Sequence, residues 1–138
     1  MIVIAFDFGI KNIGVAVGQN ITYTAQRLSS IKIKNNKINF KKIKQLFLEW
    51  QPNSIIVGLP LNMDGTKQNI TQQVEKFSKK ISLHFKIPIY FHDERLTTIE
   101  AKSILFKTNG SKSLKKEIID STSAVLILES WLKENISP

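Results

Sequence analysis

The sequence predicts one α/β domain over residues 1–138, built on a mixed sheet of five strands flanked by helices. Two apolar segments at 2–8 and 13–19 are joined by the short link GIKN, which is typical of an antiparallel hairpin. Beyond residue 39, segments of helical period alternate with short apolar strands, the order that produces parallel crossovers. The chain is 42% hydrophobic, which is enough to bury one core.

Each element follows from local pattern and turn chemistry. The helix expected at 40–50 has Phe40, Ile43 and Phe47 at helical spacing, and Pro52 ends it. Asn69 and Gln72 resemble a capping box at the start of the next helix. The expected elements are strands at 2–8, 13–19 and 22–34, a turn at 35–37, a helix at 40–50, a strand at 54–60, a loop at 62–66, a helix at 69–85, a strand at 87–92, and helices at about 97–108 and 115–134. This is the order found in ribonuclease H-like domains.

Composition favours an anionic partner. The 20 basic and 11 acidic residues leave a formal charge of +9, and nucleic acid is the first candidate for such a chain. Because lysine, isoleucine and asparagine are all abundant, single lysines carry little information, whereas the two arginines, Arg27 and Arg95, stand out. The chain has no cysteine, which excludes disulfides and thiolate zinc sites. No apolar run is long enough for a membrane helix, and we expect a cytoplasmic protein.

Several acids stand where a soluble domain rarely places them. Asp7 interrupts an apolar strand, and a lone buried carboxylate is costly unless its charge is compensated. Asp93 and Glu94 end the last expected strand. Asp120 shares a helix face with apolar residues such as Ala124 and Ile127. Structural alternatives are a turn for Asp7, helix-dipole contacts for Asp93 and Glu94, and a basic partner for Asp120.

In the expected fold, Asp7, Glu94 and Asp120 can converge at one end of the sheet. Converged carboxylates repel one another unless a cation lies between them. Ligand sets made only of oxygen favour Mg²⁺ or Mn²⁺. Two such ions about 4 Å apart are a common device for hydrolysing phosphodiesters. A basic chain with a buried acidic metal site therefore indicates a nuclease.

Four motifs together resemble the bacterial YqgF/RuvX family: FDFGIKNIGVAVG, VGLPLNMDGT, DERLTT and DSTSAVLILESWL. They occur in order and span most of the chain. The resemblance implies a ribonuclease H-like fold akin to that of the resolvase RuvC. It also implies either maturation of the 5′ end of 16S ribosomal RNA precursor or Holliday junction resolution. One departure is Ile10, where the family commonly has a small hydroxyl residue.

By this resemblance, Asp7, Glu94 and Asp120 are the catalytic, metal-binding acids. Candidate contacts to the substrate backbone are Lys11, Asn62, Thr66, Arg95, Lys115 and Lys116. An ion pair with a nearby acid is the alternative for Arg95. Whether His92 or Asp93 assists at the site is left open. The expected partners are structured RNA or branched DNA, and pre-ribosomal particles. The chain is expected to be a monomer or a weak homodimer.

Two other function classes compete with the nuclease. A sugar-kinase or actin-like ATPase also uses an Asp-x-Gly strand, but it needs two domains of this fold, and tight ATP binding would reveal it. A non-catalytic RNA- or ribosome-binding module would keep the basic surface without convergent acids. Metal-dependent cleavage separates that module from a nuclease. A zinc hydrolase is disfavoured because His84 and His92 lie far apart.

Overall fold

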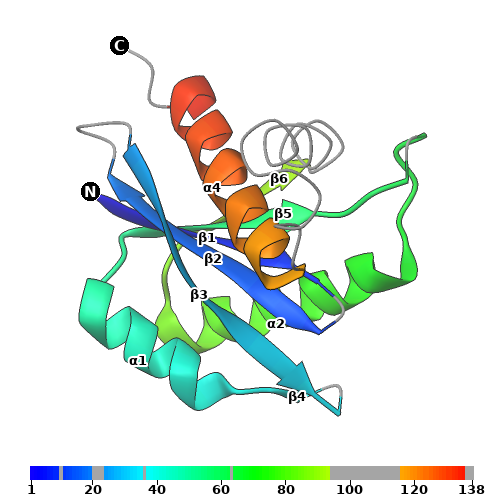
Figure 1. The fold of residues 1–138 in the computed structure, drawn as a ribbon, viewed down its shortest axis with the longest axis horizontal. Helices are drawn as coiled ribbons and strands as arrows, with labels where there is room; N and C mark the ends of the chain where they lie inside the picture. Colours follow the sequence, from blue (N-terminus) through cyan, green and yellow to red (C-terminus); the bar gives the residue numbers. More distant parts are fainter. Residues whose placement is uncertain (10, 20–23, 36, 63, 94–115, 136–138) are drawn as a thin grey trace.

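The computed structural model describes residues 1–9, 11–19, 24–35, 37–62, 64–93 and 116–135, with the backbone alone for 116–121 (Figure 1). Its elements are β1 (Ile2–Phe8), β2 (Asn12–Gln19), β3 (Thr24–Lys34), β4 (Lys37–Ile38), α1 (Phe40–Trp50), β5 (Ser54–Leu59), α2 (Asn69–Phe85), β6 (Ile89–Asp93) and α4 (Lys116–Asn135). The order of elements over the described ranges confirms the predicted α/β class.

The strands form one mixed sheet in the order β4-β3-β2-β1-β5-β6. β1 pairs antiparallel with β2 and parallel with β5, and β5 pairs parallel with β6. The carboxyl ends of β1, β5 and β6 therefore lie together at one end of the sheet. The residues that follow each parallel strand are at this end, which is where ligands bind in sheets of this kind.

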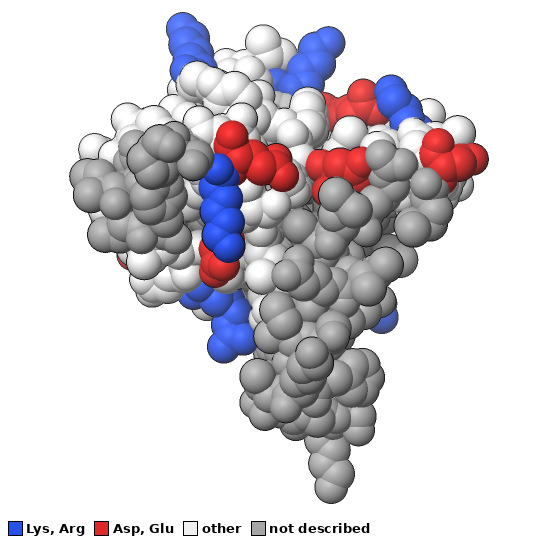
Figure 2. All heavy atoms as spheres, turned by 90° about the horizontal axis from the view of Figure 1, so that it is seen from above, with Lys and Arg blue, Asp and Glu red and all other residues white. Residues whose placement is uncertain are grey.

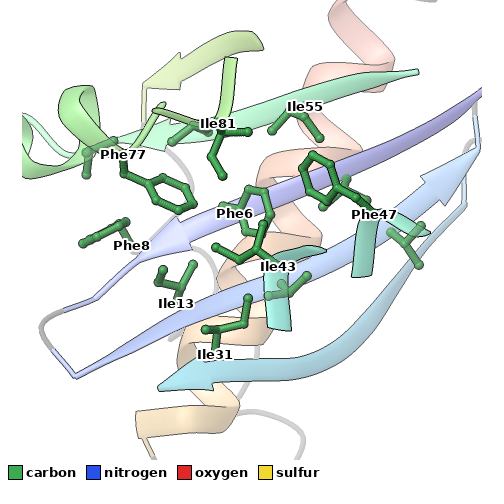
Figure 3. Close-up of a cluster of buried hydrophobic side chains, with 14 residues drawn as sticks. Phe6, Phe8, Ile13, Ile31, Ile43, Phe47, Ile55, Phe77 and Ile81 are labelled. Carbon is green, nitrogen blue, oxygen red and sulfur yellow. The ribbon is translucent and has the colours of Figure 1, made fainter. Parts of the chain in front are cut away.

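Two apolar cores cover the two faces of the sheet. On one face, α1 and α2 pack on alternate strand residues such as Phe6, Phe8 and Ile55 (Figure 3). The rings of Phe6 and Phe77 meet edge-on with their centroids 5.5 Å apart. On the other face, Val3 and Ala5 pack with residues of α4. We call these the α1/α2 face and the α4 face.

The helix ends follow from the backbone at each boundary. α1 ends at Trp50 because Gln51 takes a left-handed conformation (φ 46°) and Pro52 follows it. α2 begins after Gln68, not with the capping box predicted from Asn69 and Gln72. The backbone N–H of Gln68 donates to the Thr71 hydroxyl at 2.9 Å, and that hydroxyl donates to the Pro60 carbonyl. The capping box is thus formed by Gln68 and Thr71, one residue earlier than predicted, and Thr71 is also held by its bond to Pro60.

The described sheet has six strands where the sequence predicted five. The additional strand is β4, whose Lys37 and Ile38 pair with Lys34 and Ile33 of β3. The predicted turn at 35–37 is correct at Asn35, which has φ 51°, but Lys37 already belongs to β4. Two residues are too few to show strand alternation. The helix predicted at about 97–108 lies outside the described residues. Within the described part of the chain, no helix is both long and apolar enough to cross a lipid bilayer.

Candidate active site

Asp7 lies in the middle of the sheet, one residue before the end of β1, and is only 8% exposed. Side chains alternate between the two faces along a strand. Phe6 and Phe8 belong to the α1/α2 face, whereas Val3 and Ala5 belong to the α4 face. The alternation therefore assigns Asp7 to the α4 face, one step beyond the apolar residues that α4 covers.

Glycine flanks Asp7 on both neighbouring strands. Asp7 pairs with Gly14 of β2. On the other side, Phe6 pairs with Val57, so Gly58 is the residue of β5 level with Asp7. Because neither glycine has a side chain, neither strand places side-chain atoms beside the Asp7 carboxylate. Gly14, Asp7 and Gly58 thus form one row across three strands, in which only Asp7 has a side chain.

The same row ends at His92. Gly58 pairs with His92 of β6, and registered residues of neighbouring strands share a face. The Cα atoms of Asp7 and His92 are two strand spacings apart, or about 10 Å. Asp93 pairs with Leu59, which packs against the core of the α1/α2 face. His92 therefore shares the face of Asp7, and Asp93 does not.

Sequence reasoning missed this row. It treated Asp7 as a carboxylate in an apolar strand and left the choice between His92 and Asp93 open. The available signal was a glycine inside each of two apolar strands, in NIGVAV and IIVGLP. Glycine within a strand often marks a close approach of another group. The signal could not reveal which residues are level, because register depends on pairing between distant segments.

The direction of α4 is set by close packing at Gly18. A Cβ added at Gly18 would lie 2.9 Å from Leu128 Cδ2, so Leu128 rests directly on this glycine. Gly18 pairs with Val3, near the start of β1. Asp120 is eight residues before Leu128, about 12 Å along the helix, and Asp7 is about 13 Å along β1 from Val3. Figure 1 shows the orange N-terminal part of α4 toward the arrowhead end of β1, so the Asp120 backbone lies toward the Asp7 end of the sheet.

The other predicted acids and basic residues are placed only in part. Glu94, Arg95 and Lys115 lie outside the described residues, with Glu94 directly following β6. Asp120 and Lys116 lie in α4, where the backbone alone is described. Among the described side chains, no three His, Cys, Asp or Glu residues form a metal-binding group. Asp7 is one of these described side chains, and Glu94 and the side chain of Asp120 lie outside them.

The loop after β5 is held by its own side chains. The Thr66 hydroxyl donates to Asp64 Oδ1 at 2.6 Å and accepts from Asn62 Nδ2 at 2.9 Å. The backbone N–H of Thr66 also donates to Asp64 Oδ1, at 2.9 Å. Gly65 provides the positive φ of 90° that the turn requires. Asn62 and Thr66, predicted as substrate contacts, are thus brought together in a preformed turn near the carboxyl end of β5.

Lys11 lies in the link between β1 and β2, beside Asn12, and is exposed. Its carbonyl accepts a hydrogen bond of 2.7 Å from the backbone N–H of Ile33. This bond ties the β1–β2 link to β3. Lys11 therefore lies at the end of the sheet where β1 ends, four residues beyond Asp7.

Comparison with protein families gives a match over nearly the whole chain. The model of the RuvX family, described as Holliday junction resolvase, matches residues 1–134. A protein of Buchnera aphidicola subsp. Baizongia pistaciae, named "Putative pre-16S rRNA nuclease", is 67% identical over 131 residues, covering 95% of this chain and 96% of that protein. A protein of the same name from Haemophilus ducreyi is 50% identical over 133 residues, covering 96% of each chain.

Two solved structures with the same fold are Holliday junction resolvases. RuvC of Thermus thermophilus, in complex with a Holliday junction substrate, covers 99% of this chain and 96% of its own, with a TM-score of 0.58 and 14% identity. The fowlpox virus resolvase, in complex with Holliday junction DNA, covers 97% of this chain and 98% of its own, with a TM-score of 0.63 and 15% identity. At these identities the likeness establishes the ribonuclease H-like fold of RuvC-type resolvases.

Proposed function

Because the chain belongs to the RuvX family of Holliday junction resolvases, we propose that it is a metal-dependent nuclease that matures the 5′ end of 16S ribosomal RNA precursor. The observation that carries the activity is Asp7, buried at the end of β1 between two glycines. The substrate is proposed from the names of relatives that are 50% to 67% identical. The protein would act in the cytoplasm on pre-ribosomal particles.

The residues present fit a divalent cation. Asp7 lies between two glycines near the end of β1, Glu94 directly follows β6, and Asp120 lies in the N-terminal part of α4. A set of carboxylate oxygens matches the preference of Mg²⁺ or Mn²⁺. We propose that Asp7, Glu94 and Asp120 hold the metal. A pair of such ions activates water and stabilises the leaving oxygen of a phosphodiester.

Other residues would position the substrate. Lys11 is exposed at the same end of the sheet and would contact a phosphate. Lys115 and Lys116, at the start of α4 in the sequence, would do the same. The planar guanidinium of Arg95 suits phosphate oxygens. Asn62 and Thr66 would present a rigid turn to the substrate backbone, since their side chains already hold each other.

A monomer or weak homodimer is sufficient for this role. Resolution of a four-way junction needs two active sites acting together, and a nuclease that trims one RNA strand needs one. The relatives from Buchnera and Haemophilus are both named for a role on pre-16S rRNA. We therefore propose RNA processing and keep junction cleavage as an outcome of the test.

The test compares both substrates with one preparation of protein. Purified protein is incubated with 16S precursor RNA and with four-way junction DNA, in Mg²⁺, in Mn²⁺ and in chelator. We expect RNA cleavage that requires the metal. Cleavage of the junction alone would replace the proposed substrate, and full activity in chelator would contradict the metal-dependent mechanism.

A further inference from the structure

The positive charge of the chain is concentrated in one segment. Residues 8–48 contain eight basic residues, Lys11, Arg27, Lys32, Lys34, Lys37, Lys41, Lys42 and Lys44, and no acidic residue. This segment therefore has a net charge of +8, and the rest of the chain, with 12 basic and 11 acidic residues, has +1. Figure 2 shows acidic and basic side chains interspersed on the face seen from above. A compositional excess of lysine alone would not separate the charges in this way.

Part of this segment forms a cavity at the outer edge of the sheet. The cavity has a volume of about 400 Å³ and lies where β3, β4 and the start of α1 meet, at the lower end of Figure 1. Its lining residues are Lys32, Lys34, Asn35, Lys37, Ile38, Asn39 and Lys42. Four of these seven residues are lysines and none is acidic. We call this the β3–β4 lysine cavity.

Local backbone structure holds the lysines in place. β3 and β4 are joined through Asn35 in the left-handed region and pair at Ile33–Ile38 and Lys34–Lys37. The Asn39 side chain accepts a hydrogen bond from the backbone N–H of Lys42 at the start of α1. The cavity is thus bounded by a hairpin and a capped helix.

The β-strand lysines of the β3–β4 lysine cavity lie at the same end of the sheet as the candidate site and on the same face, whereas Lys42 reaches the cavity from α1. Ile31 and Ile33 pack toward α1 and α2, so Lys32 and Lys34 alternate onto the α4 face, where Asp7 also lies. Lys32 pairs with Asn12, two residues beyond the Gly14 that pairs with Asp7. Two strand spacings across and two residues along give about 12 Å between the Cα atoms of Asp7 and Lys32.

A distance of about 12 Å is short enough for a single nucleic-acid strand to span with a few nucleotides. Lys11 lies between the two places, at the end of β1. A nucleic-acid strand cleaved at Asp7 can therefore pass Lys11 and reach the lysine cavity. Lysine ammonium groups recognise phosphate as point charges and read no base.

We propose that the β3–β4 lysine cavity is a phosphate-binding subsite for the RNA strand, a few nucleotides from the bond that is cleaved. This inference rests on the proposed nuclease function. The subsite adds affinity and register for the substrate and takes no part in the chemistry. The substrate is held at two separate places, so a variant in the cavity should weaken binding of a long RNA while the acids remain intact.

The test measures binding in chelator, which makes it independent of cleavage. The probe is a fluorescently labelled single-stranded RNA of about 12 nucleotides, which is within the usual range of single-strand site sizes and longer than the few nucleotides proposed. Its affinity is measured by anisotropy over a range of salt concentrations. The cavity variant replaces Lys32, Lys34 and Lys37 by Gln. The control variant replaces Lys76, Lys79 and Lys133 by Gln, which removes the same charge from exposed positions on α2 and α4.

We expect the cavity variant to lose at least about tenfold in affinity and its log–log salt slope to fall by about 2, from ~0.7 for each of three single-strand phosphates. The control should stay within about twofold, with a slope change well below 1. Equal losses in both variants would show that net charge alone is sensed and would overturn the subsite. Circular dichroism establishes that each variant is folded.

Cleavage separates this inference from the proposed function. With Mg²⁺, the cavity variant should raise KM for the long RNA and leave kcat near the wild-type value. If the variant instead lowers kcat and leaves affinity unchanged, the cavity is not a binding subsite. If no metal-dependent cleavage is found but the affinity loss is specific to the cavity, the proposed function fails and the phosphate site stands.

Discussion

Asp7 and His92 lie in one row of the sheet, on the same face, with Gly58 between them. Because Gly58 has no side chain, β5 places no side-chain atoms between Asp7 and His92. A phosphodiester bound beside Asp7 would therefore lie within reach of the imidazole. Asp93, one residue further, belongs to the opposite face. The register thus separates two neighbouring residues that the sequence alone does not distinguish.

This relationship predicts unequal effects for the two neighbours. We expect His92→Ala to lower kcat by about tenfold or more, because it removes the imidazole on the face of Asp7, where the reacting bond is proposed to lie. Asp93→Ala should change kcat by less than about threefold once stability is accounted for. Steady-state cleavage kinetics on both variants checks this. A larger kcat loss in the Asp93 variant would show that the assignment of faces at β6 is wrong.

The turn after β5 predicts a role for the Thr66 hydroxyl. Thr66→Val removes the hydroxyl that joins Asn62 to Asp64, so the turn should lose its fixed shape and KM should rise. Thr66→Ser keeps the hydroxyl and should retain the wild-type KM. The pair of variants is compared at equal enzyme concentration. Equal KM values for Val and Ser would exclude any contribution of this hydrogen-bonded turn to substrate binding.

The packing of α4 on β2 predicts a stability effect without a catalytic one. A Cβ at Gly18 would lie 2.5 Å from the Thr24 carbonyl oxygen and 2.9 Å from Leu128 Cδ2. Gly18→Ala must therefore displace backbone, and we expect it to lower the free energy of unfolding by about 1–3 kcal/mol. Chemical denaturation measures this loss. Unchanged stability would mean that α4 does not rest on β2 as closely as described.

Much of the fold could be predicted because its signals are local. The helical spacing of Phe40, Ile43 and Phe47 defines α1, and the apolar run around Asp7 defines β1. What was missed depends on contacts between distant segments. α2 begins with a capping box of Gln68 and Thr71, and Thr71 is chosen over its neighbours by a further bond to the Pro60 carbonyl, which a local pattern does not contain. β4 forms only because Lys37 and Ile38 pair with β3.

The candidate site, like the fold, could be predicted from the sequence only in part. Asp7 could be singled out from sequence because a carboxylate in an apolar strand requires compensation. The row Gly14–Asp7–Gly58–His92 could not, because it depends on the pairing of β1 with β2 and β5. The β3–β4 lysine cavity was also missed. Its lysines are unremarkable one by one in a lysine-rich chain and gain meaning only when β3, β4 and α1 place them together.

The central claim, that Asp7 serves the metal and the reaction, is tested most directly by Asp7→Asn. Asparagine keeps the shape of the side chain but removes the charge that would hold Mg²⁺ or Mn²⁺. We expect metal-dependent cleavage of 16S precursor RNA to fall by about 100-fold or more, while RNA affinity measured in chelator stays within about twofold of wild type. A variant that cleaves at the wild-type rate once metal is supplied would contradict the account.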